Sequence, residues 1–189
     1  MPVCIWKGCF FNAGMHLQVC PRIPVLFFIR IGSREVHIAG MTPNPDEIWM
    51  KQMARNVTMA DWGFLSGCQY LIHDRDSKFC DSFRSIVDSA GVKPLKLPPK
   101  SPNLNPFAER WVLSLKSECL SNLIFFGEAS LKRALTDYVD HYHEERNHQG
   151  IGNLIPFPSP DFNPEAIENP IECRERLGGM LKYYYTKAA

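Results

Sequence analysis

The sequence lacks a hydrophobic run that could cross a bilayer, since the apolar stretch VLFFIRI covers only residues 25–31. It also lacks the charged and then apolar pattern of a secretory signal. Its seven cysteines show no C-x2-C spacing, which argues against a zinc knuckle, and a disulfide framework is not expected in a chain of 189 residues. We therefore expect reduced cysteines in a cytoplasmic protein without a membrane partner.

A strong overall charge is also missing, because 21 basic and 20 acidic residues leave a net charge of +1. With 45% hydrophobic and 12% aromatic residues, the chain can bury the core of one domain. The charge is uneven, however: between Gly91 and Lys116 there are five basic residues and one acid, a local charge of +4. Such a stripe is typical of a phosphate-bearing partner, or of a solvated surface.

The apolar pattern predicts an α/β protein without internal repeats. Two β-rich runs split by Gly32 and Ser33 predict a hairpin. Strand and helix patterns then alternate, so the later strands should be parallel. The expected elements are strands 25–31 and 35–39, a helix within 42–56, strand 69–73, helix 79–90, strand 92–98, helix 106–120 and helix 128–146.

The helix within 42–56 should carry Pro45 in its first turn, with Ile48, Met50 and Met53 on one apolar side. Helix 79–90 should bury one face and stop at Gly91. The predicted apolar side chains of helix 79–90 are Phe79, Phe83, Ile86, Val87 and Ala90, and those of helix 128–146 are Leu131, Leu135, Tyr138, Val139 and Tyr142.

Asp74 follows directly on an apolar strand. Functional side chains gather at the carboxyl ends of strands in α/β sheets. The alternative is an N-cap for the next helix, but Asp76 and Ser77 are better placed for that role. The position of Asp74 therefore favours a function over a cap.

Glu109 lies in the first turns of a helix whose sequence suggests Asn105 as N-cap and Pro106 as first residue. A capping box would place its glutamate at Ala108, one residue earlier. Favourable contact with the helix dipole, worth about 0.3–1 kcal/mol, would explain Glu109 if it stood alone.

Together these segments resemble a known family. The stretches HDRDSKF (73–79), KLPPKSPNLNPFAERWVLSLKSECL (96–120) and YHEERNHQG (142–150) are similar to the catalytic core of bacterial integrases and transposases of the retroviral-integrase (DDE recombinase) type. The resemblance covers about residues 25–152 and continues into RERLGGMLKYYY. It implies an RNase H-like fold, a mixed five-stranded sheet flanked by helices, whose first strand is poorly defined in this sequence.

The resemblance also implies Mg²⁺ or Mn²⁺, two ions in a complete site, held by three carboxylates. Asp74 and Glu109 match two of them. The first aspartate should come from a strand before the predicted hairpin, yet there is no aspartate before Asp46, which belongs to a helix start. In GCFFNAG (8–14) Cys9 stands at about the expected place, and a thiol is a poor Mg²⁺ ligand.

Two functions follow from this resemblance. One is DNA integration or transposition, by metal-dependent phosphodiester cleavage and strand transfer, impaired by the missing aspartate. The alternative is a non-catalytic DNA-binding or multimerising remnant. A third hypothesis, an RNase H-like nuclease, needs a further ligand near the metals; the nearest candidate, His73, should point to the other sheet face from Asp74.

Candidate DNA contacts are Lys100, Asn103, Arg110 and Lys116, which surround Glu109; a solvated helix face and a simple turn are the alternatives. His141, His143 and His148 are poor candidates for metal ligands and suit the end of a helix instead. Arg146 and His148 belong to a recurrent end-of-core motif of the resembling family. The basic and aromatic tail, 174–187, could contact DNA or a subunit, or pack on the surface.

Three segments are expected: an atypical N-terminal segment with a degenerate first strand (1–24), an integrase-like core (25–150), and a Pro-rich arm with a basic and aromatic tail (151–189). The irregular pattern of 1–24 suggests a truncated or frame-shifted copy. The partners that the resemblance implies are the DNA ends of a mobile element, its target DNA, a homo-oligomer, and a separate helix-turn-helix subunit or domain. The implied location is the bacterial cytoplasm, at the nucleoid.

Overall fold

The structure, a computed structural model, describes residues 3–11, 23–75, 79–98, 106–158 and 170–186, with only the backbone for 5–11. The chain divides into two units, Met1–Val112 and Leu113–Ala189, and the division falls within helix α3 (Pro106–Glu118). In the described ranges, no helix combines the length and apolar character needed to cross a membrane.

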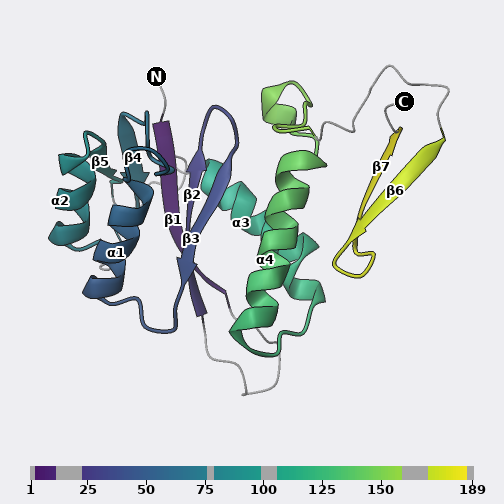
Figure 1. Cartoon of the computed structure of the whole chain (residues 1–189), viewed down its shortest axis with the longest axis horizontal. Coiled ribbons are helices and arrows are strands. Elements are labelled where there is room, and N and C mark those ends of the chain that lie inside the picture. Colours follow the sequence, from purple (N-terminus) through teal and green to yellow (C-terminus); the bar gives the residue numbers. More distant parts are fainter. Residues whose placement is uncertain (1–2, 12–22, 76–78, 99–105, 159–169, 187–189) are drawn as a thin grey trace. The chain divides into compact units, whose positions relative to one another are not determined.

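The first unit is built on a mixed five-stranded sheet with the strand order β3-β2-β1-β4-β5 (Figure 1). β1 pairs antiparallel with β2 and parallel with β4, so it lies at the centre of the sheet. The predicted hairpin is confirmed as β2 and β3, and the later strands β4 and β5 are parallel as expected. The strands are β1 (Val3–Phe11), β2 (Ile23–Arg30), β3 (Val36–Met41), β4 (Tyr70–His73) and β5 (Lys93–Lys96).

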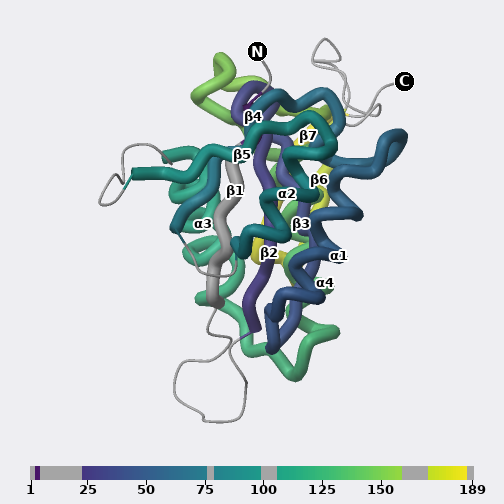
Figure 2. The backbone as a smooth tube through the Cα atoms, turned by 90° about the vertical axis from the view of Figure 1, so that its left-hand side faces the viewer, coloured from purple at the N-terminus to yellow at the C-terminus, as the bar shows by residue number. Residues whose placement is uncertain are grey.

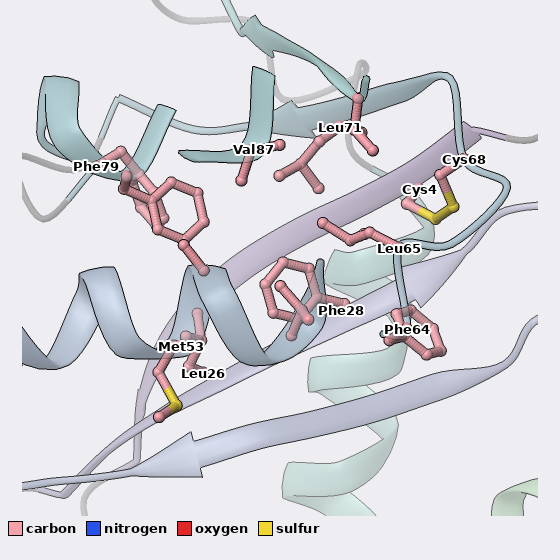
Figure 3. Close-up of a cluster of buried hydrophobic side chains, with 14 of the residues drawn as sticks. Cys4, Leu26, Phe28, Met53, Phe64, Leu65, Cys68, Leu71, Phe79 and Val87 are labelled. Atoms are coloured by element: carbon pink, nitrogen blue, oxygen red, sulfur yellow. A yellow bond between two sulfur atoms is a disulfide. The ribbon is translucent and has the colours of Figure 1, made fainter. Parts of the chain in front are cut away.

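Helices α1 (Glu47–Val57) and α2 (Asp81–Ser89) pack side by side on one face of this sheet (Figure 2). Figure 3 shows their apolar side chains meeting those of the strands in one buried cluster. Phe83 and Val87 of α2 are fully buried, as the periodicity predicts, and Gly91 ends this helix region with a φ of +82°. The cluster includes Leu26, Phe28, Met50, Met53, Leu65, Leu71, Phe79, Phe83 and Val87.

Three details of the predicted helices were wrong. Ala90, expected on the buried face of helix 79–90, is exposed at the C-cap of α2. Pro45 precedes α1, because Asp46 is the N-cap and its carboxylate accepts from the Trp49 N–H at 2.8 Å. Ile48, expected on the apolar side, is 78% exposed, because residues two apart on a helix point to different sides and α1 buries Met50 and Met53. The N-cap of α2 is Cys80; the proposed caps at 76 and 77 lie outside the described residues.

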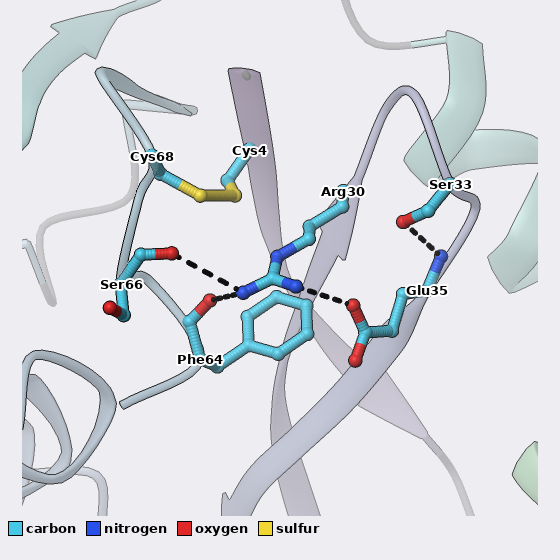
Figure 4. The surroundings of a disulfide bond; sticks show 7 residues. All are labelled: Cys4, Arg30, Ser33, Glu35, Phe64, Ser66 and Cys68. Atoms are coloured by element: carbon cyan, nitrogen blue, oxygen red, sulfur yellow. Dashed lines mark hydrogen bonds and ion pairs between the residues drawn. A yellow bond between two sulfur atoms is a disulfide. The ribbon is translucent and has the colours of Figure 1, made fainter. Parts of the chain in front are cut away.

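The prediction that all cysteines are reduced was wrong for one pair. Cys4 at the start of β1 and Cys68 before β4 form a disulfide, with Cα atoms 6.4 Å apart (Figure 4). They are 64 residues apart in sequence and meet because β1 and β4 are neighbours. Arg30 holds the same loop: its guanidinium donates to the Phe64 carbonyl at 2.6 Å and lies 4.7 Å from the Phe64 ring.

The second unit contains helix α4 (Gly127–Glu144), which buries the expected side chains except Val139, together with Ala134. Short 3-10 turns lie at Leu120–Asn122 and Gln149–Ile151. The unit also contains an antiparallel hairpin of β6 (Ile171–Arg176) and β7 (Leu181–Thr186), in a region where the sequence predicts only an arm and a tail.

The hairpin is fixed to the end of α4 by ion pairs. Arg176 donates from Nε to Glu145 Oε1 at 2.9 Å and reaches Asp140 and Glu144 at 3.4 Å each. Arg174 lies 3.6 Å from the same Glu145 oxygen. Two basic residues of the tail, for which the sequence left DNA contact, subunit contact and surface packing open, thus pair with acids of their own chain.

Candidate active site

Asp74 directly follows β4, as the sequence predicted, and is half-buried. β4 lies between β1 and β5 and is parallel to both. Asp74 therefore leaves the carboxyl edge of the parallel part of the sheet, the position at which α/β folds place their functional groups.

The backbone around Asp74 is held on both sides. The carbonyl of His73 accepts from the Leu97 N–H at 2.9 Å, and the Asp74 carbonyl lies 2.7 Å from Nδ1 of the His73 ring. Arg75 Nε donates in turn to the Leu97 carbonyl at 2.9 Å. Asp74 is thus carried by a firmly bonded strand end.

The strand register shows which face of the sheet Asp74 occupies. Trp111 of α3 packs on Phe27 of β2, with ring centroids 4.2 Å apart, and Phe27 pairs with Lys7 of β1. The last pair in the parallel register of β1 with β4 is Ile5 with Ile72. Two residues further along both strands, Asp74 is level with Lys7. Residues that are level across strands share a face, so Asp74 belongs to the face that α3 covers.

His73 occupies the opposite face, as predicted. Its ring is only 1% exposed and lies 5.2 Å from the ring of Phe79, a member of the cluster under α1 and α2. Burial lowers the pKa of His73. A direct ligand role beside Asp74, which the nuclease hypothesis would need, is therefore not supported by the geometry.

Glu109 is exposed and lies in the first turn of α3. The helix is anchored on either side of it: Trp111 is buried against Phe27, and the Arg34 guanidinium lies 4.0 Å from the ring centroid of Phe107. Arg34 belongs to the turn between β2 and β3 and has a positive φ of 63°. The β2–β3 hairpin therefore positions the beginning of the helix that carries Glu109.

Cys9 lies in β1, where its backbone pairs with Val25 of β2. Its position is two residues beyond Lys7, the residue level with Asp74, and two residues span about 7 Å along a strand. The side chain of Cys9 is outside the described part of the chain. β1 itself forms nine residues of regular strand and fills the centre of the sheet.

Of the predicted DNA contacts, Arg110 and Lys116 are exposed on α3. Lys100 and Asn103 lie outside the described residues. Lys116 stands in the last turn of α3, where a cation interacts favourably with the helix dipole.

The end-of-core motif has a structural role. Arg146 binds the carboxylate of Glu118 and donates to the Tyr138 hydroxyl at 3.1 Å. His148 Nε2 lies 2.8 Å from the Tyr142 carbonyl, and His141 Nδ1 lies 2.8 Å from Glu145. These side chains tie the end of α4 to neighbouring segments of the second unit.

The donor chemistry of the candidate site is that of a hard cation. Carboxylates such as Asp74 and Glu109 are the ligand type that Mg²⁺ and Mn²⁺ prefer, and these ions complete their coordination with water. Among the residues whose side chains are described, no group of three His, Cys, Asp or Glu gathers to hold a metal ion. The third ligand that the resemblance implies is predicted at Cys9, whose thiol would be a soft ligand.

Comparison with known proteins identifies the same segments. Residues 90–156 match the integrase core domain family. The catalytic core domain of BIV integrase is similar over 82% of this chain and 90% of that chain, with 13% identity and a TM-score of 0.57. The HTLV-2 integrase catalytic core domain in complex with magnesium, in its trimeric form, is similar over 82% and 92%, with 8% identity and a TM-score of 0.58.

A chain of the simian T-cell lymphotropic virus intasome, in complex with PP2A regulatory subunit B56 gamma, is similar over 97% of this chain and 66% of that chain, with 11% identity and a TM-score of 0.61. No curated protein sequence matches. The matches confirm the α/β, RNase H-like fold and the resemblance to integrase cores. The matched family segment contains Glu109 and the YHEERNHQG motif; Asp74 and Cys9 precede it.

Proposed function

We propose that this chain, which carries an integrase-type core, cuts and joins DNA phosphodiesters with a divalent metal ion, and that Cys9 impairs the reaction. The match of residues 90–156 to the integrase core domain family supports integration or transposition of DNA as its function. The proposal of metal-dependent cutting and joining rests on the positions of two carboxylates. Asp74 leaves the carboxyl edge of β4 on the face that α3 covers, and α3 carries Glu109 in its first turn.

Asp74 and Glu109 would hold the metal ion. When bound, Mg²⁺ activates a water or a 3′-hydroxyl and stabilises the leaving oxygen of the phosphodiester. The exposed guanidinium of Arg110, next to Glu109, would pair with a backbone phosphate of the DNA. Lys116 would add a second, sequence-independent phosphate contact, and Lys100 and Asn103 are proposed to line the same path.

The second candidate function is a DNA-binding or multimerising protein without catalysis. Cys9 favours it, since a neutral thiol does not replace a carboxylate that bridges hard cations. The regular strand around Cys9 favours the first candidate, because a carboxylate introduced there would extend from a well-formed β1.

The partners proposed here are those of an integrase. They are the DNA ends of a mobile element, its target DNA and further copies of this chain. A helix-turn-helix subunit or domain would supply sequence recognition.

The test is Mn²⁺-dependent nicking and joining of supercoiled DNA, run on four proteins. These are the unaltered chain, Cys9→Asp, Cys9→Asp with Glu109→Gln, and Cys9→Asp with Asp74→Asn. We expect weak or absent nicking by the unaltered chain, a clear gain in Cys9→Asp, and loss of that gain in both double variants. Retained DNA binding in the double variants, measured at two salt concentrations, controls for folding.

Other outcomes discriminate the alternatives. If the unaltered chain is active, and if Asp74→Asn and Glu109→Gln introduced singly into it abolish that activity, a third ligand other than Cys9 exists. If all four proteins are folded and bind DNA but none nicks it, the non-catalytic function is supported. Activity that survives both Asp74→Asn and Glu109→Gln would refute the proposed site.

A further inference from the structure

We propose that His73 is a positioning residue that fixes the direction of the Asp74 carboxylate by holding the peptide group after it. This inference rests on the proposed function, in which Asp74 is a metal ligand. Its geometric basis is one contact: His73 Nδ1 lies 2.7 Å from the carbonyl oxygen of Asp74. The ring reaches this oxygen from the buried side of the sheet, where His73 is 1% exposed.

The contact defines which ring nitrogen carries the proton. A carbonyl oxygen can only accept a hydrogen bond, so Nδ1 must be the donor. Nε2 is buried and has no hydrogen-bond partner among the described residues. A neutral ring protonated at Nδ1 is therefore the form that satisfies the contact without burying an unpaired N–H.

The effect on Asp74 follows from the planarity of the peptide group. The peptide before Asp74 is fixed through the His73 carbonyl, which accepts from the Leu97 N–H at 2.9 Å. The peptide after Asp74 is fixed through the Asp74 carbonyl, which accepts from the His73 ring. With both flanking planes held, φ and ψ of Asp74 are set, and so is the direction of its Cβ.

The two hydrogen bonds that hold the peptide groups before and after Asp74 differ in origin. The Leu97 bond continues the parallel pairing of β4 with β5 and needs no particular side chain. The His73 bond depends on one imidazole, and it acts where β4 ends, beyond the last ladder pair at His73 and Lys96. The His73 bond therefore holds the peptide group after Asp74, which lies beyond the paired residues of β4 and β5.

The test measures Mn²⁺ affinity by water-proton relaxation on the full chain. The variants are His73→Asn, His73→Leu, Phe79→Leu and Asp74→Asn. The asparagine amide keeps a donor near the Nδ1 position, whereas leucine keeps volume without a donor. Phe79→Leu removes the ring contact and leaves the hydrogen bond, so it controls for packing.

We expect Asp74→Asn to abolish the specific binding and His73→Leu to weaken it about 10-fold, the lower end of the range for residues that orient metal ligands. His73→Asn should stay within about 3-fold of the unaltered chain, and Phe79→Leu should lower thermal stability without changing the affinity. Equal affinity of His73→Leu and the unaltered chain would overturn the proposal, as would an equal loss in Phe79→Leu.

A metal-free measurement separates this inference from the proposed function. Long-range proton–nitrogen NMR spectra should show His73 protonated at Nδ1, and amide relaxation should show Asp74 and Arg75 as ordered as β4. In His73→Leu, but not in His73→Asn, the order parameter of Arg75 should fall from about 0.85 towards 0.6. If Asp74→Asn leaves Mn²⁺ binding unchanged, the metal site fails. The order parameter of Arg75 alone then decides whether His73 holds the peptide group after Asp74.

Discussion

Replacing Glu145 should release the β6–β7 hairpin from α4. The Glu145 side chain is only 1% exposed and accepts from Arg176 at 2.9 Å, with His141 at 2.8 Å on its other oxygen. In Glu145→Ala both Arg174 and Arg176 lose this partner. Removing one member of a buried ion pair costs about 3–5 kcal/mol. Arg176 keeps weaker contacts to acids of α4 at 3.4 Å, so the lower end, about 3 kcal/mol, applies.

The loss should appear as local opening of the hairpin, since an isolated two-stranded ribbon is marginally stable in water. About 3 kcal/mol corresponds to a fall of roughly 100-fold in amide protection against hydrogen exchange. The assay is native-state exchange of the β6 and β7 amides, with α4 amides as internal reference. We expect the α4 core amides around Leu135 to keep most of their protection.

A matched control is Glu175→Gln, which removes an exposed pair with Lys182 inside the hairpin, at 3.1 Å. Exposed pairs contribute about 0–1 kcal/mol, so protection should change less than about 5-fold. Glu145→Gln keeps an acceptor for Arg176 without the charge and should fall between the two. Hairpin amides in Glu145→Ala that remain as protected as in the unaltered chain would show that the ion pairs do not hold the hairpin.

Three further outcomes are expected. Thiol titration in denaturant without reductant should find two thiols fewer than after reduction, and a full thiol count would contradict the bond. Reduction of the Cys4–Cys68 bond should lower the free energy of unfolding by about 4 kcal/mol, because the bond closes a loop of 64 residues. Gly63→Ala should lower the urea midpoint by an amount worth about 1–3 kcal/mol, because its Cβ would lie 2.4 Å from a backbone oxygen, whereas Gly32→Ala, with open space, should not. Burial lowers the pKa of His37, an effect opposed by Glu35 and reinforced by Arg30, so its contribution to stability is complete above pH about 6.5 and is lost as pH falls through the lowered value. His37→Phe should therefore flatten the decline in stability below pH 6.5, and an unchanged slope would contradict it.

The elements that depend on local pattern could be predicted from the sequence. The β2–β3 hairpin, the buried face of α2 and its end at Gly91 all follow from short-range periodicity and turn chemistry. The same local signals place Asp74 at a strand end and Glu109 at the beginning of a helix. The sequence alone therefore predicts the secondary structure that carries each of these two carboxylates. It does not show which face of the sheet they share.

Features that depend on distant partners could not be predicted. The sequence does not show the alternating strand pattern of β6, because the side chains of Arg174 and Arg176 are charged. Their acidic partner lies at the end of α4, about 30 residues earlier in the chain. The Cys4–Cys68 bond depends on the pairing of β1 with β4, which no spacing of cysteines reveals. The contact of the His73 ring with the Asp74 carbonyl depends on how His73 is buried. The sequence pattern places His73 on the opposite sheet face from Asp74, but it does not reveal this contact.

The place of β1 has a consequence for the synthesis of the chain. Its antiparallel partner β2 follows within a few tens of residues, but its other neighbour, β4, pairs Tyr70 with Val3, 67 positions later. On the ribosome, the β1–β2–β3 meander can therefore form while the second edge of its most central strand is still bare. An open edge pairs readily with other chains, and late non-local pairing is slow. Until β4 emerges, the strand that will lie at the centre of the sheet therefore presents an open edge, at which the nascent chain can aggregate.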